Sequence, residues 1–260
     1  MLGAEQRMRS FATLSAYALK MGCDIDHALH RIKRAMGYHQ NFHSTKGQDR
    51  WIIKNMLFSH RGGFFVEVGA ADGFTHSNSY VLERDYGWTG IAVEANSCYA
   101  AELRSNRKCR CVHACVDDDE RSIDFFEFGF LSGIVDHDTD NNFTTRDFLL
   151  RRYPNKIRKM QTTTLLQILL SEGAPSTIDY LSLDVEGAEH RILRNFPFDR
   201  FRFECVTIER PTHALHDLLS GAGYILTKIF RYDGFYVSRE LALKFGLSGP
   251  PFGGIARKFF

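Results

Sequence analysis

The sequence predicts an α/β fold, a doubly wound and mostly parallel sheet of seven strands with helices on both faces. Two observations support this prediction. Short apolar strands alternate with helical stretches along most of the chain, beginning with a buried run at 64–68. Near the end the order changes, because YILTKIF and FYVSRE flank the turn RYDG and predict an antiparallel hairpin.

The elements follow one another in a regular order. A helix at 44–57 leads into the first strand, and helical residues at 77–84 lead into a second strand at 90–95. Later elements are expected as helices at 97–105, 162–170 and 188–195, and as strands at 109–116, 123–128, 178–184 and 203–209. The aspartate-rich stretch 129–142 reads either as a lid or substrate contact, or as a solvated insertion.

Composition limits the class of protein. The chain has 260 residues, of which 44% are hydrophobic, so it can bury one substantial core. Its formal net charge of +2 is too balanced to indicate nucleic acid or an anionic membrane as the main partner. No run reads as a membrane span, and the N-terminus shows no convincing cleavage site. We therefore expect a cytoplasmic protein.

Two regions are expected along the chain. Residues 1–43 carry apolar side chains at helical spacing and predict an N-terminal helical extension. This extension would pack on the main domain, cap a site or mediate association, so a homo-oligomer is one expectation. Residues 44–260 form the main domain.

The stretch FFVEVGAADG is the first candidate ligand site. Glu67 interrupts an apolar strand, and a buried carboxylate costs free energy unless it is paired or serves a ligand. Gly69 and Gly73 allow a tight turn in which the backbone approaches a ligand closely. The spacing differs from the dinucleotide fingerprint, which disfavours NAD, and Asp72 adds negative charge. An acidic turn suits a ligand with an amino group and a sulfonium, as in S-adenosylmethionine.

A second strand, GIAVEAN, ends in Glu94, about 20 residues after the glycine turn. In a βαβ unit an acidic residue at this offset meets ribose hydroxyls. The turn and Glu94 together favour an adenosyl cofactor.

Carboxylates follow two later strands, in LSLDVEGAEH and CVTIER. Asp184, Glu186 and Glu209 would converge at the carboxyl edge of the sheet, where their oxygen atoms suit Mg²⁺ or Ca²⁺. The competing hypothesis is general base catalysis by Glu186 or His190, with His213 as a further candidate. A third reading is that the acids merely favour a helix N-terminus.

Several of these segments together resemble one known family. GQDRWI, FFVEVGAADGFTHSNSYVLE, GWTGIAVEAN, TTTLLQIL and IDYLSLDVEGAEHRIL are similar to the FkbM-type S-adenosylmethionine-dependent methyltransferases. The resemblance covers about residues 44–240, and DVEGAE is its most specific part. It implies the Rossmann-like class I methyltransferase fold. It also implies O-methylation of a hydroxyl on a sugar, a polyketide or another small natural product.

The resemblance also implies roles for individual positions. Ala71 and Ser182 depart from the family pattern, which often has Asn and Lys there. Cofactor contacts are implied at Glu67, Gly69, Asp72, Ser77, Asn78, Glu94 and, near the adenine, Asp117, while Asp184 and Glu186 would face the transferred methyl.

A different class of function stays open. Some proteins that resemble this family act as interaction proteins, so the fold could serve without turnover. The main expectation is an enzyme whose partner is a small hydroxylated acceptor and not nucleic acid, with S-adenosylmethionine as cofactor and Mg²⁺ as the candidate ion.

Overall fold

The computed structural model describes residues 42–53 and 62–246. The helical extension expected over 1–43 therefore lies, apart from its last two residues, outside the described residues. Within the described residues, no helix is long and apolar enough to cross a bilayer.

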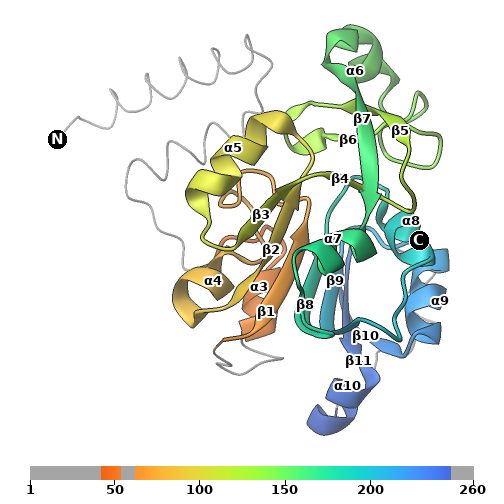
Figure 1. Ribbon diagram of the computed structural model, residues 1–260. Helices are drawn as coiled ribbons and strands as arrows, with labels where there is room; N and C mark the ends of the chain where they lie inside the picture. The colour runs from red at the N-terminus through yellow and green to blue at the C-terminus, as the bar shows by residue number, and fades with distance from the viewer. Residues whose placement is uncertain (1–41, 54–61, 247–260) are drawn as a thin grey trace, which may run out of the picture.

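The main sheet has seven strands in the order β10-β11-β9-β8-β1-β2-β3. Neighbours from β3 to β9 run parallel, whereas β11 is antiparallel to both β9 and β10. The predicted α/β class is confirmed (Figure 1). The strands are β1 Phe64–Val68, β2 Thr89–Glu94, β3 Arg110–His113, β8 Thr177–Leu183, β9 Arg202–Ile208, β10 Tyr224–Phe230 and β11 Asp233–Ser238.

A second, four-stranded sheet was not predicted. Its order is β4-β7-β5-β6. The single strand expected at 109–116 is in fact broken at Ala114, because β2 ends at Glu94 and the chain then pairs with β7 instead. The strands are β4 Cys115–Asp117, β5 Ser122–Phe126, β6 Gly133–Ile134 and β7 Ile157–Thr164.

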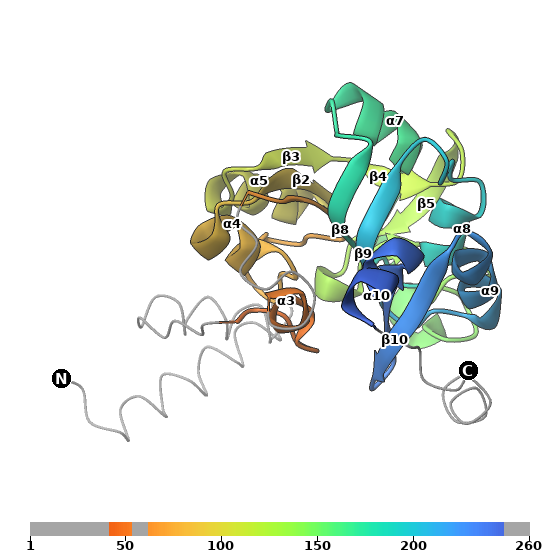
Figure 2. The ribbon, with the colours of Figure 1, turned by 90° about the horizontal axis from the view of Figure 1, so that it is seen from below.

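Helices cover both faces of the main sheet, because side chains along each strand alternate between the faces. Val66 and its neighbours pack against α7, α8 and α9, and Phe65 and its neighbours pack against α3, α4 and α10. Figures 1 and 2 show this layering. The helices are α3 Gln48–Trp51, α4 Tyr80–Tyr86, α5 Ser97–Asn106, η2 Gly129–Leu131, α6 Asp147–Arg152, η3 Pro154–Lys156, α7 Leu165–Ser171, α8 Glu189–Arg194, α9 His213–Gly221 and α10 Arg239–Phe245.

Side-chain caps fix where several helices begin. Asn96 accepts a hydrogen bond from the Cys98 amide at 2.9 Å at the start of α5. Thr164 and Gln167 form a capping box, so α7 begins at Leu165 and not at 162 as predicted. The threonines before this cap complete β7.

The carboxylate of Glu67 is buried in the middle of the fold, with 2% of the residue exposed. It accepts hydrogen bonds from the Asn78 amide at 2.6 Å and from the hydroxyls of Ser77 and Ser79 at 2.9 and 2.5 Å. Arg107, just after α5, donates to it at 3.2 Å. This network ties β1, the loop before α4 and the end of α5 into one unit.

Replacing Arg107 with Met should lower the free energy of unfolding by about 3–5 kcal/mol, because Glu67 would be left as an unpaired buried charge. Urea unfolding measures this loss. Adding Glu67→Gln should restore part of it, since the stranded charge is removed. Arg110→Met is the matched control, because Arg110 is exposed. Equal losses of stability in Arg107→Met and Arg110→Met would contradict the role given to the network.

Candidate active site

A cavity of about 320 Å³ opens at the carboxyl edge of the main sheet. Its lining includes Gly69 after β1, Glu94 at the end of β2, Asp184 after β8 and Glu209 after β9. The second sheet adds a further wall through Phe125 and the segment 129–134. The cavity is therefore where open α/β sheets bind their ligands.

Gly69 brings the ends of β1 and β8 together. Its φ is +85°, and a Cβ at this position would lie 1.8 Å from the carbonyl oxygen of Asp184. Only glycine fits such an approach in this conformation. The predicted close backbone turn is thus present, and its second function is to seat the Asp184 loop beside the cavity.

Asp72 shapes the turn and does not line the cavity. It is 2% exposed, and its carboxylate accepts from the amides of Phe74 and Thr75 at 2.9 and 2.6 Å. The Thr75 hydroxyl donates to it at 2.7 Å. The residues that follow, Thr75 to Asn78, form part of the lining.

Glu94 lies on the wall of the cavity with its carboxylate fixed by the backbone. The amides of Ala71 and Asn96 donate to its two oxygens at 2.7 and 2.6 Å. Burial raises the pKa of Glu94 to about 7 despite these hydrogen bonds. The remaining lone pairs can accept from ligand hydroxyls.

Three other predicted cofactor contacts, Glu67, Ser77 and Asn78, also line the cavity. Their polar atoms are largely taken up within the protein, since Ser77 donates to Glu67 and the Asn78 side-chain amide donates to the Ser182 hydroxyl at 2.8 Å. Ser182, a departure from the family pattern, is thus part of a buried polar chain.

Apolar side chains form a second part of the wall. Cys115, Phe125, Ile134 and Ala188 pack as one buried cluster, and all of them line the cavity. Such a surface can hold a flat heterocycle beside Glu94. The signal available in the sequence was the run of aromatic and apolar residues that leads into the 129–142 stretch.

The segment before α3 closes another side. Thr45 and Lys46 line the cavity, and Ser44 bridges to His76. Asp49 of the GQDRWI motif holds this segment by accepting from the His43 and Ser44 amides at 2.6 and 3.2 Å. The motif therefore serves the cavity wall.

The three carboxylates of Asp184, Glu186 and Glu209 meet as predicted from their places after the strands. Each has an oxygen within 4.8 Å of the others. Burial, followed by repulsion from Glu209 and then Glu186, raises the pKa of Asp184 well above its usual value. Burial likewise raises the pKa of Glu186, which Arg146 opposes.

Two arginines at this cluster were not predicted. Arg146 donates to Glu186 at 2.6 Å, and Arg210 donates to Glu186 at 3.1 Å and to Glu209 at 2.9 Å. Glu186 itself has a φ of +61°, which is strained for a residue with a side chain. Arg210 directly follows Glu209 in sequence, so its role could have been suspected, whereas Arg146 comes from a distant loop.

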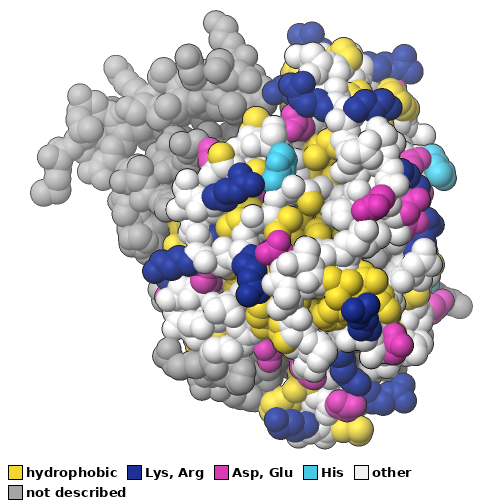
Figure 3. Space-filling view, in the orientation of Figure 1, with side chains coloured by type: hydrophobic (Ala, Val, Ile, Leu, Met, Phe, Trp, Pro, Cys, Tyr) yellow, Lys and Arg dark blue, Asp and Glu magenta, His cyan; other side chains and the backbone are white. Residues whose placement is uncertain are grey.

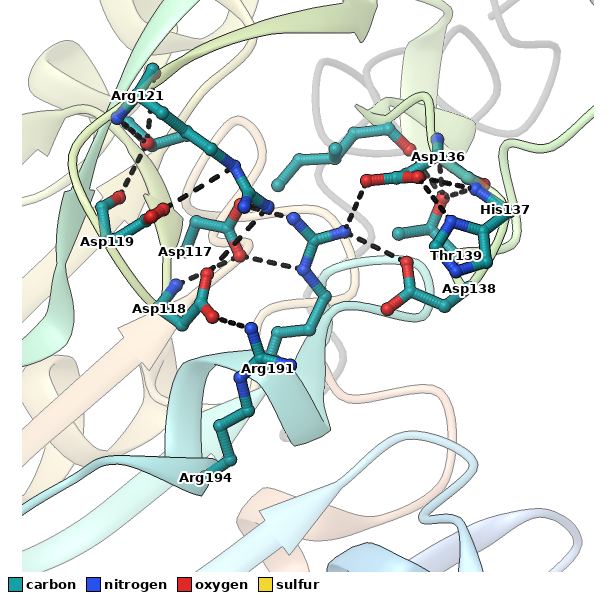
Figure 4. Close-up of polar contacts among 12 residues, drawn as sticks. Asp117, Asp118, Asp119, Arg121, Asp136, His137, Asp138, Thr139, Arg191 and Arg194 are labelled. Carbon is teal, nitrogen blue, oxygen red and sulfur yellow. Dashed lines mark hydrogen bonds and ion pairs between the residues drawn. The ribbon is translucent and has the colours of Figure 1, made fainter.

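Asp117 lies behind the wall and is not among the lining residues. Arg191 donates to its two oxygens at 2.9 and 2.5 Å, as Figure 4 shows, and Arg121 donates at 2.8 Å. The other nitrogen of Arg191 reaches Asp136 and Asp138, each at 3.0 Å. Arg191 therefore joins the end of β4 to the aspartate-rich loop.

That loop packs against the turn after β8. The Asp140 amide donates to the carbonyl oxygen of Glu186 at 3.0 Å. A Cβ on Gly187 would come within 2.6 Å of the Asp140 nitrogen, so the contact requires glycine there. The loop is thus a fixed support for the carboxylate cluster.

Glu189 and His190, at the start of α8, differ in their position relative to the cavity. His190 does not line the cavity. Glu189 is 4% exposed, and it accepts from the amides of Val185 and Gly187 at 2.9 and 3.4 Å. It holds the turn that carries Glu186, and burial raises the pKa of Glu189 to about 8.

Comparison with protein families gives one match, to the family described as Methyltransferase FkbM domain, over residues 67–226. A comparison with curated proteins finds no match. Among solved structures, a precorrin-6y C5,15-methyltransferase from Geobacter metallireducens GS-15 is similar with a TM-score of 0.38 and 13% identity, covering 74% of this chain and 87% of that chain. A human methyltransferase 10 domain containing protein is similar with a TM-score of 0.31 and 11% identity, covering 82% of this chain and 81% of that chain.

The buried Glu189 predicts a fall in stability with rising pH. Its pKa is about 8 in the folded chain against a reference value of 4.5, so the folded state holds the extra proton between these values. The free energy of unfolding should then fall by up to about 1.4 kcal/mol per pH unit from this group. Glu189→Gln should make the fall shallower in urea unfolding at several pH values, while Glu172→Gln should not. A Glu189→Gln profile as steep as that of the wild type would contradict this.

Proposed function

We propose that this chain, which belongs to the methyltransferase FkbM domain family, is an S-adenosylmethionine-dependent O-methyltransferase. Its acceptor is a hydroxyl on a sugar, a polyketide or another small natural product. The observation that carries the proposal is one cavity lined both by Glu94 and by the carboxylates of Asp184, Glu186 and Glu209. A ribose-binding acid and a proton-accepting cluster thus face the same space.

The residues present fit the cofactor. Glu94 would accept hydrogen bonds from the ribose hydroxyls, and the apolar wall at Cys115, Phe125 and Ile134 suits adenine. Negative charge around the cavity suits an amino group and a sulfonium. When bound, S-adenosylmethionine supplies an electrophilic methyl group. Asp117 would act on the adenine side only indirectly, through the wall that Arg191 holds.

The protein's part in the transfer is alignment and removal of a proton. The cavity would hold the acceptor hydroxyl facing the methyl group that S-adenosylmethionine supplies, and a carboxylate would take the hydroxyl's proton as the methyl is transferred. Alignment alone can supply about 7–11 kcal/mol. Asp184 is the best base, because within the described part of the chain no ion pair engages it, whereas Glu186 and Glu209 bind arginines. A bound sulfonium would favour its ionised form.

Mg²⁺ is the less favoured way to activate the hydroxyl. The three carboxylates offer oxygen ligands within 4.8 Å of one another. However, an ion there would compete with Arg146 and Arg210 for Glu186 and Glu209. We therefore assign proton removal to the carboxylates. We expect the chain to be active without Mg²⁺ and in the presence of a chelator.

The first test is calorimetric titration of the purified chain with S-adenosylhomocysteine and, separately, with NAD. We expect micromolar binding of the former only. Glu94→Ala should weaken it at least tenfold, since hydrogen bonds to a charged group each contribute about 1.5–3 kcal/mol. Asp199→Ala, at an exposed acid outside the cavity, is the matched control. No binding by the wild type would leave the interaction-protein alternative as the working hypothesis.

Asp184→Asn tests the proposed base. Transfer of a labelled methyl group to a panel of hydroxylated acceptors should be abolished, because Asn cannot take the proton. The affinity for S-adenosylhomocysteine should stay within a few fold. Equal loss of affinity and turnover would instead make Asp184 a cofactor contact, and loss of turnover in His190→Asn alone would assign the base to His190.

A further inference from the structure

Positive charge is concentrated in one short stretch of the chain. Residues 143–159, FTTRDFLLRRYPNKIRK, hold six Lys or Arg and one Asp, a net charge of +5 against +2 for all 260 residues. The remainder of the chain is therefore net negative. This stretch forms α6, η3 and the start of β7.

Most of these cations are at the surface. The side chains of Arg151, Arg158 and Lys159 are 74%, 61% and 71% exposed, although each has an acidic partner. For Arg152 and Lys156 the described residues provide no acidic partner within ion-pair distance. The pairs of Arg151 and Lys159 are exposed on both sides and are therefore weak in water, so these two cations stay available to another anionic surface.

Two phenylalanines of the same stretch are exposed. Phe148 on α6 is 76% exposed and Phe143 just before it is 57% exposed. A single exposed apolar side chain is ordinary, but two large exposed aromatic rings within a basic stretch are typical of a surface that binds another molecule. We define the α6 surface as Phe143, Phe148, Arg151, Arg152, Lys156, Arg158 and Lys159.

The α6 surface projects from the body of the molecule. Figure 1 shows α6 at the top, beyond the second sheet and away from the main sheet. In the same orientation, the space-filling view shows Lys and Arg side chains gathered around this end with hydrophobic side chains among them (Figure 3). The arrangement allows an extended flat partner to reach the patch.

The segment that carries the α6 surface also contacts the cavity wall, through other residues. Arg146 donates to the carbonyl oxygen of Leu131 at 2.9 Å, and the ring of Tyr153 lies 4.9 Å from that of Phe128. Leu131 lines the cavity. A partner docked on α6 would therefore lie next to one wall of the active-site cavity.

We propose that the α6 surface docks this chain onto an anionic lipid surface. Cations near such a surface each strengthen binding by about fivefold, and phenylalanines insert into the boundary between headgroups and acyl chains. Because exposed aromatic rings also stack on bases, single-stranded nucleic acid is the alternative partner that the test includes. The inference does not rest on methyl transfer, although docking would place the cavity beside hydroxyls of lipid headgroups.

Co-sedimentation of the full chain with vesicles tests the inference. One set contains equal parts of phosphatidylcholine and phosphatidylserine, and the other contains phosphatidylcholine alone. We expect binding to the first set only, and weaker binding as salt is raised, because the attraction between charges is screened.

Paired variants localise the binding. Arg152→Glu with Lys156→Glu should weaken it at least tenfold, whereas Arg104→Glu with Lys244→Glu changes the charge equally at exposed sites outside the patch and should weaken it much less. Phe148→Ser should cost about tenfold. Leu243→Ser is its control, since Leu243 is also 76% exposed but lies on α10. Circular dichroism confirms that each variant is folded.

Three outcomes would overturn the inference. The wild type could fail to bind the phosphatidylserine vesicles, or the control variants could lose binding as much as the patch variants. Binding of a single-stranded oligonucleotide through the same residues, without vesicle binding, would replace the lipid by nucleic acid. Failure of S-adenosylhomocysteine binding would bear on the proposed function alone.

Discussion

The buried carboxylate of Glu67 is the constraint on which the cavity depends. A charge in the centre of a parallel sheet is costly, so the surrounding sequence has to supply donors for it. Ser77, Asn78 and Ser79 do so, which fixes the loop that walls the cavity, and Arg107 ties the end of α5 to the same carboxylate. Asn78 extends the polar chain to Ser182 on β8. One set of hydrogen bonds therefore both stabilises the sheet and fixes the shape of the site.

A second group of carboxylates, at the end of the sheet, lowers the stability of the fold. Asp184, Glu186 and Glu209 crowd together at the end of the sheet, and the backbone at Glu186 and Arg210 has positive φ values of 61° and 47°. Both features cost stability, and the fold tolerates them because Arg146 and Arg210 supply charge and Glu189 holds the turn. Groups with pKa values shifted by burial and by like charges are typical of sites that move protons. The strain is therefore concentrated where the proposed chemistry needs a strong proton acceptor.

The sequence was sufficient for features that depend on near neighbours. The apolar strands, the glycine turn, Glu94 and the carboxylate cluster all follow from local pattern and from the rule that parallel strands end at one edge. The sequence was insufficient where a residue binds another residue that is distant in the chain. Nothing near Asp117 indicates that Arg191, more than 70 residues later, will occupy its carboxylate. The second sheet was missed because β7, IRKMQTTT, shows solvent-facing cations and no apolar alternation. Net charge likewise carries no information on local charge, since the total of +2 conceals the +5 of residues 143–159.

Arg146 connects α6 to the carboxylate cluster of the cavity. It is the N-cap residue of α6, two positions before the exposed Phe148, yet its guanidinium points inward to Glu186 and to the backbone of Leu131. Asn141 accepts a third hydrogen bond from it at 2.7 Å, so the side chain is held in one orientation. These hydrogen bonds fasten the start of α6 to Glu186 and to the cavity wall. The position of Glu186 is therefore set partly by the segment that also carries the α6 surface, so the proposed docking site and the carboxylate cluster share one structural support.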